Sequence, residues 1–353
     1  MSFIRTGIVL LMMVQALPAA PGWRCKSHVS LSYLHDNNVF ESLKNRQSDH
    51  VGRFMCQFST QNDFISSGFF QAVYQAGVEG YASHTSENRM VNDLNALCQF
   101  RVRKSFSLCL PVQARAKTYF EWDWGYGFYS TEPALLWIPS RKIQSRLFFS
   151  MSSFDYQQGR EYDHRFLGWG LSLRWEPLEN INWFVQWRGG RLTYRRNALQ
   201  SWERNKADEV EWVLTGNRQQ DDLNTVFLSL EIYQWALFQW GAGYQWNRSN
   251  SVGFSYNRPR ATLLVSKKLP WNLTMSVFWQ RQWKHYQDVF LPLLQIRPER
   301  DVEENEIRLL ELARELRPNL SVRCRWAWYE NESPFRDRYY EKQRLSLGFS
   351  LIF

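Results

Sequence analysis

Arginines recur at alternate positions of apolar segments along this chain, and their guanidinium groups could bind anions. In LSVRCRWAWY (320–329), Arg323 and Arg325 alternate with Cys324 and Trp326. Successive side chains of a β-strand point to opposite faces, so these arginines would share one polar face. Guanidinium groups that line a water-filled passage favour anions over cations. The arginines that alternation assigns to this polar face are Arg53, Arg101, Arg146, Arg174, Arg188, Arg323, Arg325 and Arg344.

The alternative is that these arginines pair with acidic loop residues or fill the interior of the fold. Few acidic residues share the polar face within the predicted strands, and Glu231 is one of them. The formal net charge of +9 could indicate a nucleic-acid partner. The arginines are scattered along strand interiors, however, and form no basic surface stripe, so we predict no such partner.

The segment GYASHTSENRMVNDLN (80–95) contains a second candidate site, because a histidine near a serine could activate the hydroxyl as a nucleophile. Alternation would turn His84 and Ser86 outward, near the extracellular rim. The stretch is similar to the motif of outer-membrane phospholipase A, which uses Ser, His and Asn with calcium at the lipid interface. That resemblance implies Ser86 as nucleophile, His84 as base, and Asn92 or Asn95 as the orienting residue. The glycine that follows the serine in that family is missing here. The alternative is a polar segment at the junction of strand and loop, without catalytic function.

No other motif points to a metal or a cofactor, and we predict neither. The remaining histidines occur singly, without the spacing of a metal site: His28, His35, His50, His164 and His285. Five cysteines in 353 residues do not make a disulfide framework. Alternation turns Cys98 and Cys109 to opposite faces, so we expect no bond between them.

The residues that could do chemistry must be positioned by strands, because the dominant periodicity is two. Aromatic residues make up 16% of the chain, yet mean hydropathy is only −0.48. A β-sandwich uses strands of about five to six residues, whereas a membrane barrel needs about nine to eleven. Most strands here are of the longer kind. We therefore predict an all-β fold, a transmembrane antiparallel up-and-down β-barrel. Aromatic residues near strand ends suggest interfacial girdles: Trp175, Trp187, Tyr194, Trp246 and Trp271.

Short and long breaks alternate along the chain. Seven short turns are expected near 61–63, 103–105, 140–142, 177–180, 234–236, 267–270 and 317–319. Eight long loops are expected near 35–48, 81–89, 121–132, 157–164, 196–222, 247–251, 286–300 and 330–338. Together they separate sixteen strands, and an even number places both termini on the same side, in the periplasm.

Two segments fit the strand pattern less well. Residues 303–318 (EENEIRLLELARELRP) favour a helix by propensity and by apolar spacing. We still predict a strand there, because its removal would make the strand count odd. The long stretch 196–222 could contain a short helix or fold into the lumen.

The two ends of the chain indicate where the protein is located. Residues 1–22 combine Arg5, a short apolar core and small residues, which predicts a cleaved signal peptide before a single barrel domain at 23–353. The last residues, RLSLGFSLIF, resemble the C-terminal signature of Gram-negative outer-membrane barrels, in which Ser346, Gly348, Leu351 and Phe353 occupy the signature positions. The resemblance implies recognition by the barrel-assembly machinery and contact with outer-membrane lipid and lipopolysaccharide.

Near the other end, LSYLHDNNVFES (31–42) resembles the first strand and loop of several barrels with a Tyr-x-x-Asp-Asn-x-Val-Phe-like stretch. Some of those accompany polysaccharide export or surface-lipoprotein display. We therefore expect a porin-like channel or an export-associated barrel that handles a small anionic solute or an exported polymer. A lipid hydrolase that uses His84 and Ser86 is the enzymatic alternative. A structural or adhesin barrel that acts through its outer loops is the third hypothesis.

Overall fold

The alternating segments form hydrogen-bonded β-strands throughout a computed structural model, which describes residues 22–42, 45–65, 68–123, 125–204, 210–287, 306–331 and 340–353. Its strands are β1 (Trp23–Asp36), β2 (Asp49–Ile65), β3 (Gly68–Tyr81), β4 (Arg89–Arg103), β5 (Phe106–Tyr119), β6 (Tyr126–Thr131), β7 (Ala134–Ser140), β8 (Ile143–Tyr156), β9 (His164–Leu178), β10 (Ile181–Arg204), β11 (Val210–Tyr233), β12 (Leu237–Ser249), β13 (Tyr256–Leu269), β14 (Leu273–Gln282), β15 (His285–Tyr286), β16 (Glu306–Arg317), β17 (Leu320–Asn331) and β18 (Tyr340–Ile352). The described helical turns are η1 (Thr85–Glu87) and η2 (Arg160–Tyr162). No helix among the described residues has the length and hydropathy needed to cross a membrane. The expected signal peptide falls on residues outside the described ranges.

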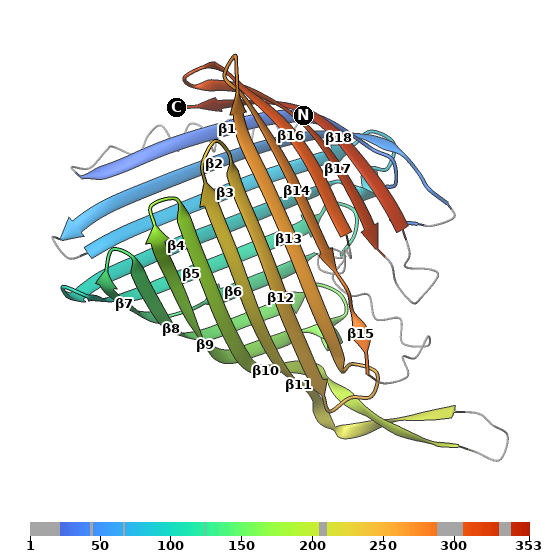
Figure 1. Ribbon diagram of the computed structural model, residues 1–353. Helices are drawn as coiled ribbons and strands as arrows, with labels where there is room; N and C mark the ends of the chain where they lie inside the picture. Colours follow the sequence, from blue (N-terminus) through green and yellow to red (C-terminus); the bar gives the residue numbers. More distant parts are fainter. Residues whose placement is uncertain are drawn as a thin grey trace.

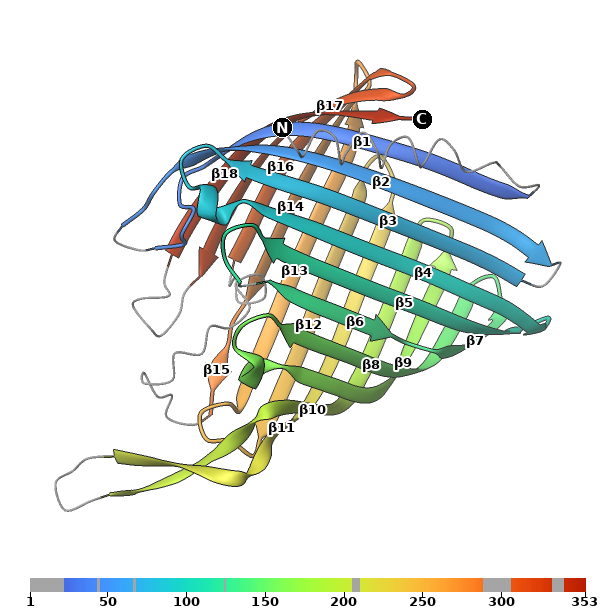
Figure 2. The same cartoon turned by 180° about the vertical axis from the view of Figure 1, so that it is seen from behind.

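The sheet closes on itself, because β1 pairs with β2 on one side and with β18 on the other (Figures 1 and 2). Every strand pairing is antiparallel. β6 and β7 share one position between β5 and β8, and β15 pairs with β13 beyond the end of β14. The predicted sixteen-strand antiparallel barrel is therefore confirmed. A closed barrel leaves no unpaired sheet edge, as a bilayer requires.

The two faces of the sheet differ in crowding, and β9 shows the difference clearly. Leu167, Trp169 and Leu171 are about half exposed, whereas Phe166 and Ser172, which flank them on the opposite face, are buried. Side chains splay apart on the convex outer face of a barrel and crowd on the concave inner face. The apolar residues of β9 therefore face outward, and cross-strand register assigns the other strands to the same two faces.

Tyr194 is an exception to the predicted aromatic girdle. It lies on the inner face, paired with His164, and the Arg196 guanidinium lies 4.9 Å from its ring. Tyr194 is an even number of residues from Arg188, so the alternation that turns Arg188 inward turns Tyr194 inward as well, and a position near a strand end does not by itself put an aromatic ring on the lipid side.

Three predicted boundaries are wrong for a common physical reason. β2 continues through the turn expected at 61–63, β6 lies within the loop expected at 121–132, and β10 and β11 extend through much of 196–222. The last two strands have 24 residues each and form a hairpin that projects beyond the barrel rim (Figures 1 and 2). In each case the backbone goes on pairing after the apolar alternation ends, so the sequence pattern stops before the strand does.

The strand predicted at 303–318 is confirmed over the described part of that segment, as β16 (Glu306–Arg317). It pairs with β14 and β17 despite its helical propensity. An unpaired edge on each neighbour would leave backbone groups without partners in lipid, and this cost exceeds a propensity difference of a few tenths of a kcal/mol per residue.

Glycines on the inner face let aromatic rings lie flat against the sheet, which predicts a steric effect of substitution. A Cβ on Gly170 would meet the Phe148 ring and would lie 2.5 Å from the Trp187 carbonyl oxygen. We expect Gly170→Ala to lower the free energy of unfolding by about 1 to 3 kcal/mol, measured in urea in detergent micelles. Gly52→Ala is the control, since nothing lies within 4 Å of its Cβ position. Equal stability of both variants would contradict this packing argument.

Candidate functional site

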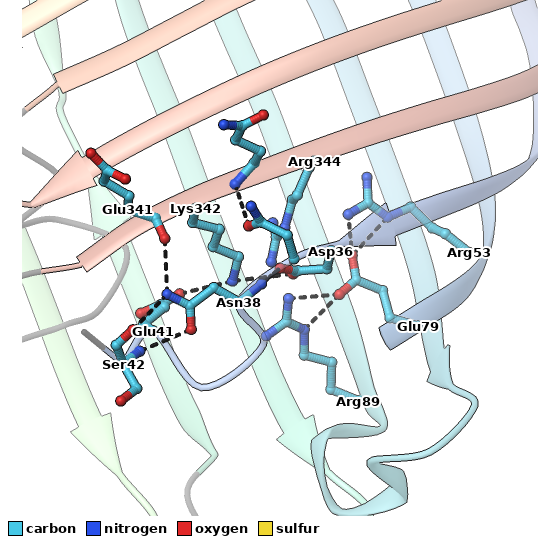
Figure 3. Close-up of polar contacts among 12 residues, drawn as sticks. Asp36, Asn38, Glu41, Ser42, Arg53, Glu79, Arg89, Glu341, Lys342 and Arg344 are labelled. Carbon is cyan, nitrogen blue, oxygen red and sulfur yellow. Dashed lines mark hydrogen bonds and ion pairs between the residues drawn. The ribbon is translucent and has the colours of Figure 1, made fainter. Parts of the chain in front are cut away.

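The segment HDNNVF (35–40) begins a polar cluster on the inner face, where the first and last strands meet at the long-loop rim (Figure 3). Asn38 organises the chain as it leaves β1. Its backbone N–H donates to Asp36 Oδ1 at 3.1 Å, and its side-chain amide donates to the carbonyl oxygens of Ser42 at 2.9 Å and Glu341 at 2.8 Å. The first long loop is thereby tied to β18, which begins about 300 residues later in the sequence.

Asp36 is the centre of the cluster and is fully buried, with 0% of its surface exposed. It accepts from Arg344 Nε at 2.9 Å and lies 3.2 Å from Lys342 Nζ. Lys342 is only 2% exposed and also contacts Glu41 Oε1 at 3.1 Å. Charges removed from water in this way require partners with good geometry, and each of these groups has them.

Glu79 extends the cluster to β2, β3 and β4. Its two oxygens accept from Arg53 Nε at 2.7 Å and from Arg89 Nε at 2.7 Å (Figure 3). We name the set Asp36, Glu41, Arg53, Glu79, Arg89, Lys342 and Arg344 the seam cluster. It contains three carboxylates and four cations, so its formal charge is positive.

The first long loop also bends into the barrel through apolar contacts. Val39, three residues after the end of β1, is buried with Leu34, Val51 and Tyr81. Those three side chains have inner-face register. Burial of this small apolar group holds the loop against the inner wall, where it occupies part of the mouth of the barrel.

Two further carboxylates on the inner side each contact two arginines. Glu132 lies 3.3 Å from Arg146 and 3.5 Å from Arg188. Glu311 of β16 lies 3.4 Å from Arg323 and accepts from Arg325 Nε at 2.8 Å. Each group keeps one positive charge in excess of its carboxylate, as Glu79 does with Arg53 and Arg89.

The eight sequence-predicted arginines thus fall into two sets. Register puts all of them on the inner face. Six form the ion pairs described above, and for Arg101 and Arg174 the described part of the chain shows no acidic partner within 4.0 Å. Five further cations have inner-face register but were not in the predicted set: Arg89, Arg115, Arg258, Arg260 and Lys342.

The residues of the hydrolase hypothesis do not come together. His84 Nδ1 lies 3.0 Å from Asp49 Oδ2, and His84 Nε2 lies 2.7 Å from Gln47 Oε1, so both ring nitrogens have partners other than Ser86. Asn92 accepts from the Tyr74 hydroxyl on the outer face, whereas Asn95 bonds Asp93 on the inner face. His84 points towards Asp49 of β2 and not towards lipid, because the chain leaves strand geometry after Tyr81. This arrangement does not favour a catalytic triad.

Asp49 instead fixes the second long loop. Its carboxylate accepts from the backbone N–H groups of Ser83 at 3.0 Å and His84 at 2.8 Å, and contacts the His84 ring. We expect Asp49→Ala to accelerate amide hydrogen exchange across 82–88 by about tenfold to a hundredfold, because bonds to charged groups are worth about 1.5 to 3 kcal/mol. Asp63→Ala, at an exposed pair with Arg24, is the control. Unchanged exchange in Asp49→Ala would show that other contacts hold the loop.

The residues of the C-terminal signature are in the last strand or directly after it and make ordinary strand contacts. Ser346 and Gly348 lie on the inner face opposite Leu34 and Ser32, and Leu351 has outward register. Phe353 donates its backbone N–H to Ser27 O at 2.8 Å. All five cysteines are free. Among the described residues, no three His, Cys, Asp or Glu side chains are grouped as metal ligands.

No protein-family model and no curated protein matches the sequence. Solved structures do match. OmpF of Salmonella typhi, in complex with daunomycin, aligns at TM-score 0.51 and 6% identity, over 94% of this chain and 98% of that one. The chain shares the β-barrel fold of this protein. OccK8 (OprE) of Pseudomonas aeruginosa aligns at 0.48 and 9%, over 94% and 98%. A loop-deletion mutant of the Vibrio cholerae outer-membrane protein OmpT aligns at 0.47 and 6%, over 94% and 100%.

Proposed function

We propose that this barrel is an outer-membrane channel that prefers small anionic solutes. The observation that carries the proposal is the repeated pairing of one inner-face carboxylate with two arginines, at Glu79, Glu132 and Glu311. These groups are on β3, between β6 and β7, and on β16, so excess positive charge surrounds the lumen. An anion entering the lumen would meet favourable potential on several sides.

The outer surface supports the membrane location. Leu31, Leu147, Trp169, Leu345 and Phe349 are each about half exposed or more on the outer face, although they are large and apolar. A contiguous apolar surface of this kind is stable in lipid and unfavourable in water. In this proposal the chain ends face the periplasm, the long loops face outward, and the final strand is the segment that the barrel-assembly machinery binds.

The test is ion selectivity of the purified protein in planar lipid bilayers. Under a potassium chloride gradient, we expect discrete conductance steps and a reversal potential with the sign for chloride preference. Absence of conductance would contradict the channel and favour the structural or adhesin hypothesis. A cation-selective reversal potential would contradict the anion preference while leaving a channel.

A further inference from the structure

We propose that the outer face of β9 to β12, at the long-loop rim, binds the phosphate groups of lipid A in the outer leaflet. This inference rests on the membrane location and orientation of the proposed function, but not on channel activity. It concerns residues that face away from the lumen.

The surface, named here the arginine band, consists of Arg165 of β9, Arg191 and Arg195 of β10, Arg218 of β11 and Arg248 of β12. All five are exposed. Arg191 and Arg248 flank Asp222 in one row across three adjacent strands. Neighbouring strands lie about 4.8 Å apart, so the backbones at Arg191 and Arg248 are about 10 Å apart. Arg165 lies one row nearer the rim, paired with Thr193.

The acidic residues of this surface are too few to neutralise the arginine band. Arg191 Nε lies 2.8 Å from Asp222, but the two side chains are 58% and 56% exposed. Arg195 lies 3.6 Å from Asp163, and Asp155 of β8 bonds Ser153. An exposed pair such as Arg191–Asp222 contributes about 0 to 1 kcal/mol. Five guanidinium groups therefore face three carboxylates.

Directly below the arginine band, the same strands present an apolar surface. Trp169 and Trp187 pack edge to face with ring centroids 4.4 Å apart, and Leu167 and Tyr244 are about half exposed beside them. The strands thus place acyl-chain contacts and phosphate contacts one above the other. Arginine binds phosphate through paired N–H donors, which suits it to this level of a lipid leaflet.

The opposite ends of the same strands identify the occupant. At the short-turn rim their exposed residues include Trp175, Leu178, Tyr233 and Trp235, which are aromatic or apolar. On the lipid side of β9 to β12, the exposed arginines thus lie at the rim of the long loops. An asymmetric bilayer with a phosphate-rich glycolipid in one leaflet matches this asymmetry, whereas a bilayer with the same phospholipids in both leaflets does not. Charge complementarity therefore selects lipid A over ordinary phospholipid.

The experiment compares binding of bisphosphorylated lipid A, dephosphorylated lipid A and phosphatidylglycerol to the full chain in nanodiscs, by native mass spectrometry. The test variant is Arg165→Gln/Arg191→Gln/Arg248→Gln. The matched control removes three exposed arginines at the short-turn rim, Arg103→Gln/Arg141→Gln/Arg317→Gln. We expect at least tenfold preference for the bisphosphorylated lipid in the wild type and the control, and loss of that preference in the test variant.

Equal binding of phosphorylated and dephosphorylated lipid A would overturn the inference. Equal binding of phosphatidylglycerol, or an equal loss in the control variant, would do the same by showing non-specific attraction. Bilayer conductance of the same preparations separates this result from the proposed function. The test variant should keep the wild-type selectivity, because its substitutions lie outside the lumen.

Discussion

Lys342→Met is expected to lower the free energy of unfolding by about 3 to 5 kcal/mol, the usual cost of removing one partner from a buried ion pair. The substitution keeps side-chain volume but leaves Asp36 and Glu41 without the ammonium group between them. Asp36 stays fully buried and keeps only Arg344 as a cationic partner. The strands that close the barrel would be weakened at their junction. The measurement is urea unfolding in detergent micelles, followed by tryptophan fluorescence.

Lys26→Met is the matched control, since Lys26 has inner-face register on β1 but is exposed near the other rim. It should change stability by less than about 0.5 kcal/mol. A double-mutant cycle of Lys342→Met with Asp36→Asn should give a coupling energy above about 1 kcal/mol, because the two groups are in contact. Additive effects would show that Lys342 acts through packing and not through its charge.

Reversal of charge beside Glu311 is expected to convert the channel from anion to cation preference. In Arg323→Glu/Arg325→Glu, three carboxylates would replace one carboxylate and two guanidinium groups at the same point of the inner wall. Both arginines are partly exposed, at 49% and 39%, so solutes in the lumen can sense the change. The reversal potential under a salt gradient should change sign.

The control for this experiment makes the same charge change on the outer face, as Arg165→Glu/Arg191→Glu. The wall of the barrel separates those positions from the lumen, so chloride preference should persist. If both double variants shifted the reversal potential equally, the selectivity would arise from overall charge and not from the inner wall.

The sequence alone was sufficient to predict the barrel fold. Apolar and polar residues alternate along a strand whose two faces lie in different surroundings, and this period of two is visible in the sequence. LSVRCRWAWY and FLGWGLSLRW alternate in this way, and their faces in the structure follow from it. The even strand count also predicted β16 correctly, since removing this strand would have reversed the direction of the final strand. The predicted breaks at 61–63, 121–132 and 196–222 were wrong because backbone pairing continues where the apolar alternation ends.

The sequence by itself determined that arginine lies on a polar face opposite an apolar one, because alternation is a local property of the backbone. Only the tertiary structure decided which charges meet. Asp36 and Lys342 are 306 positions apart and become neighbours because the last strand pairs with the first. His84 and Ser86 are near in sequence, yet His84 binds Asp49, because β2 and β3 bring their long-loop ends together. Alternation along a strand determines which face a side chain is on, whereas strand register and barrel closure determine which side chain it meets.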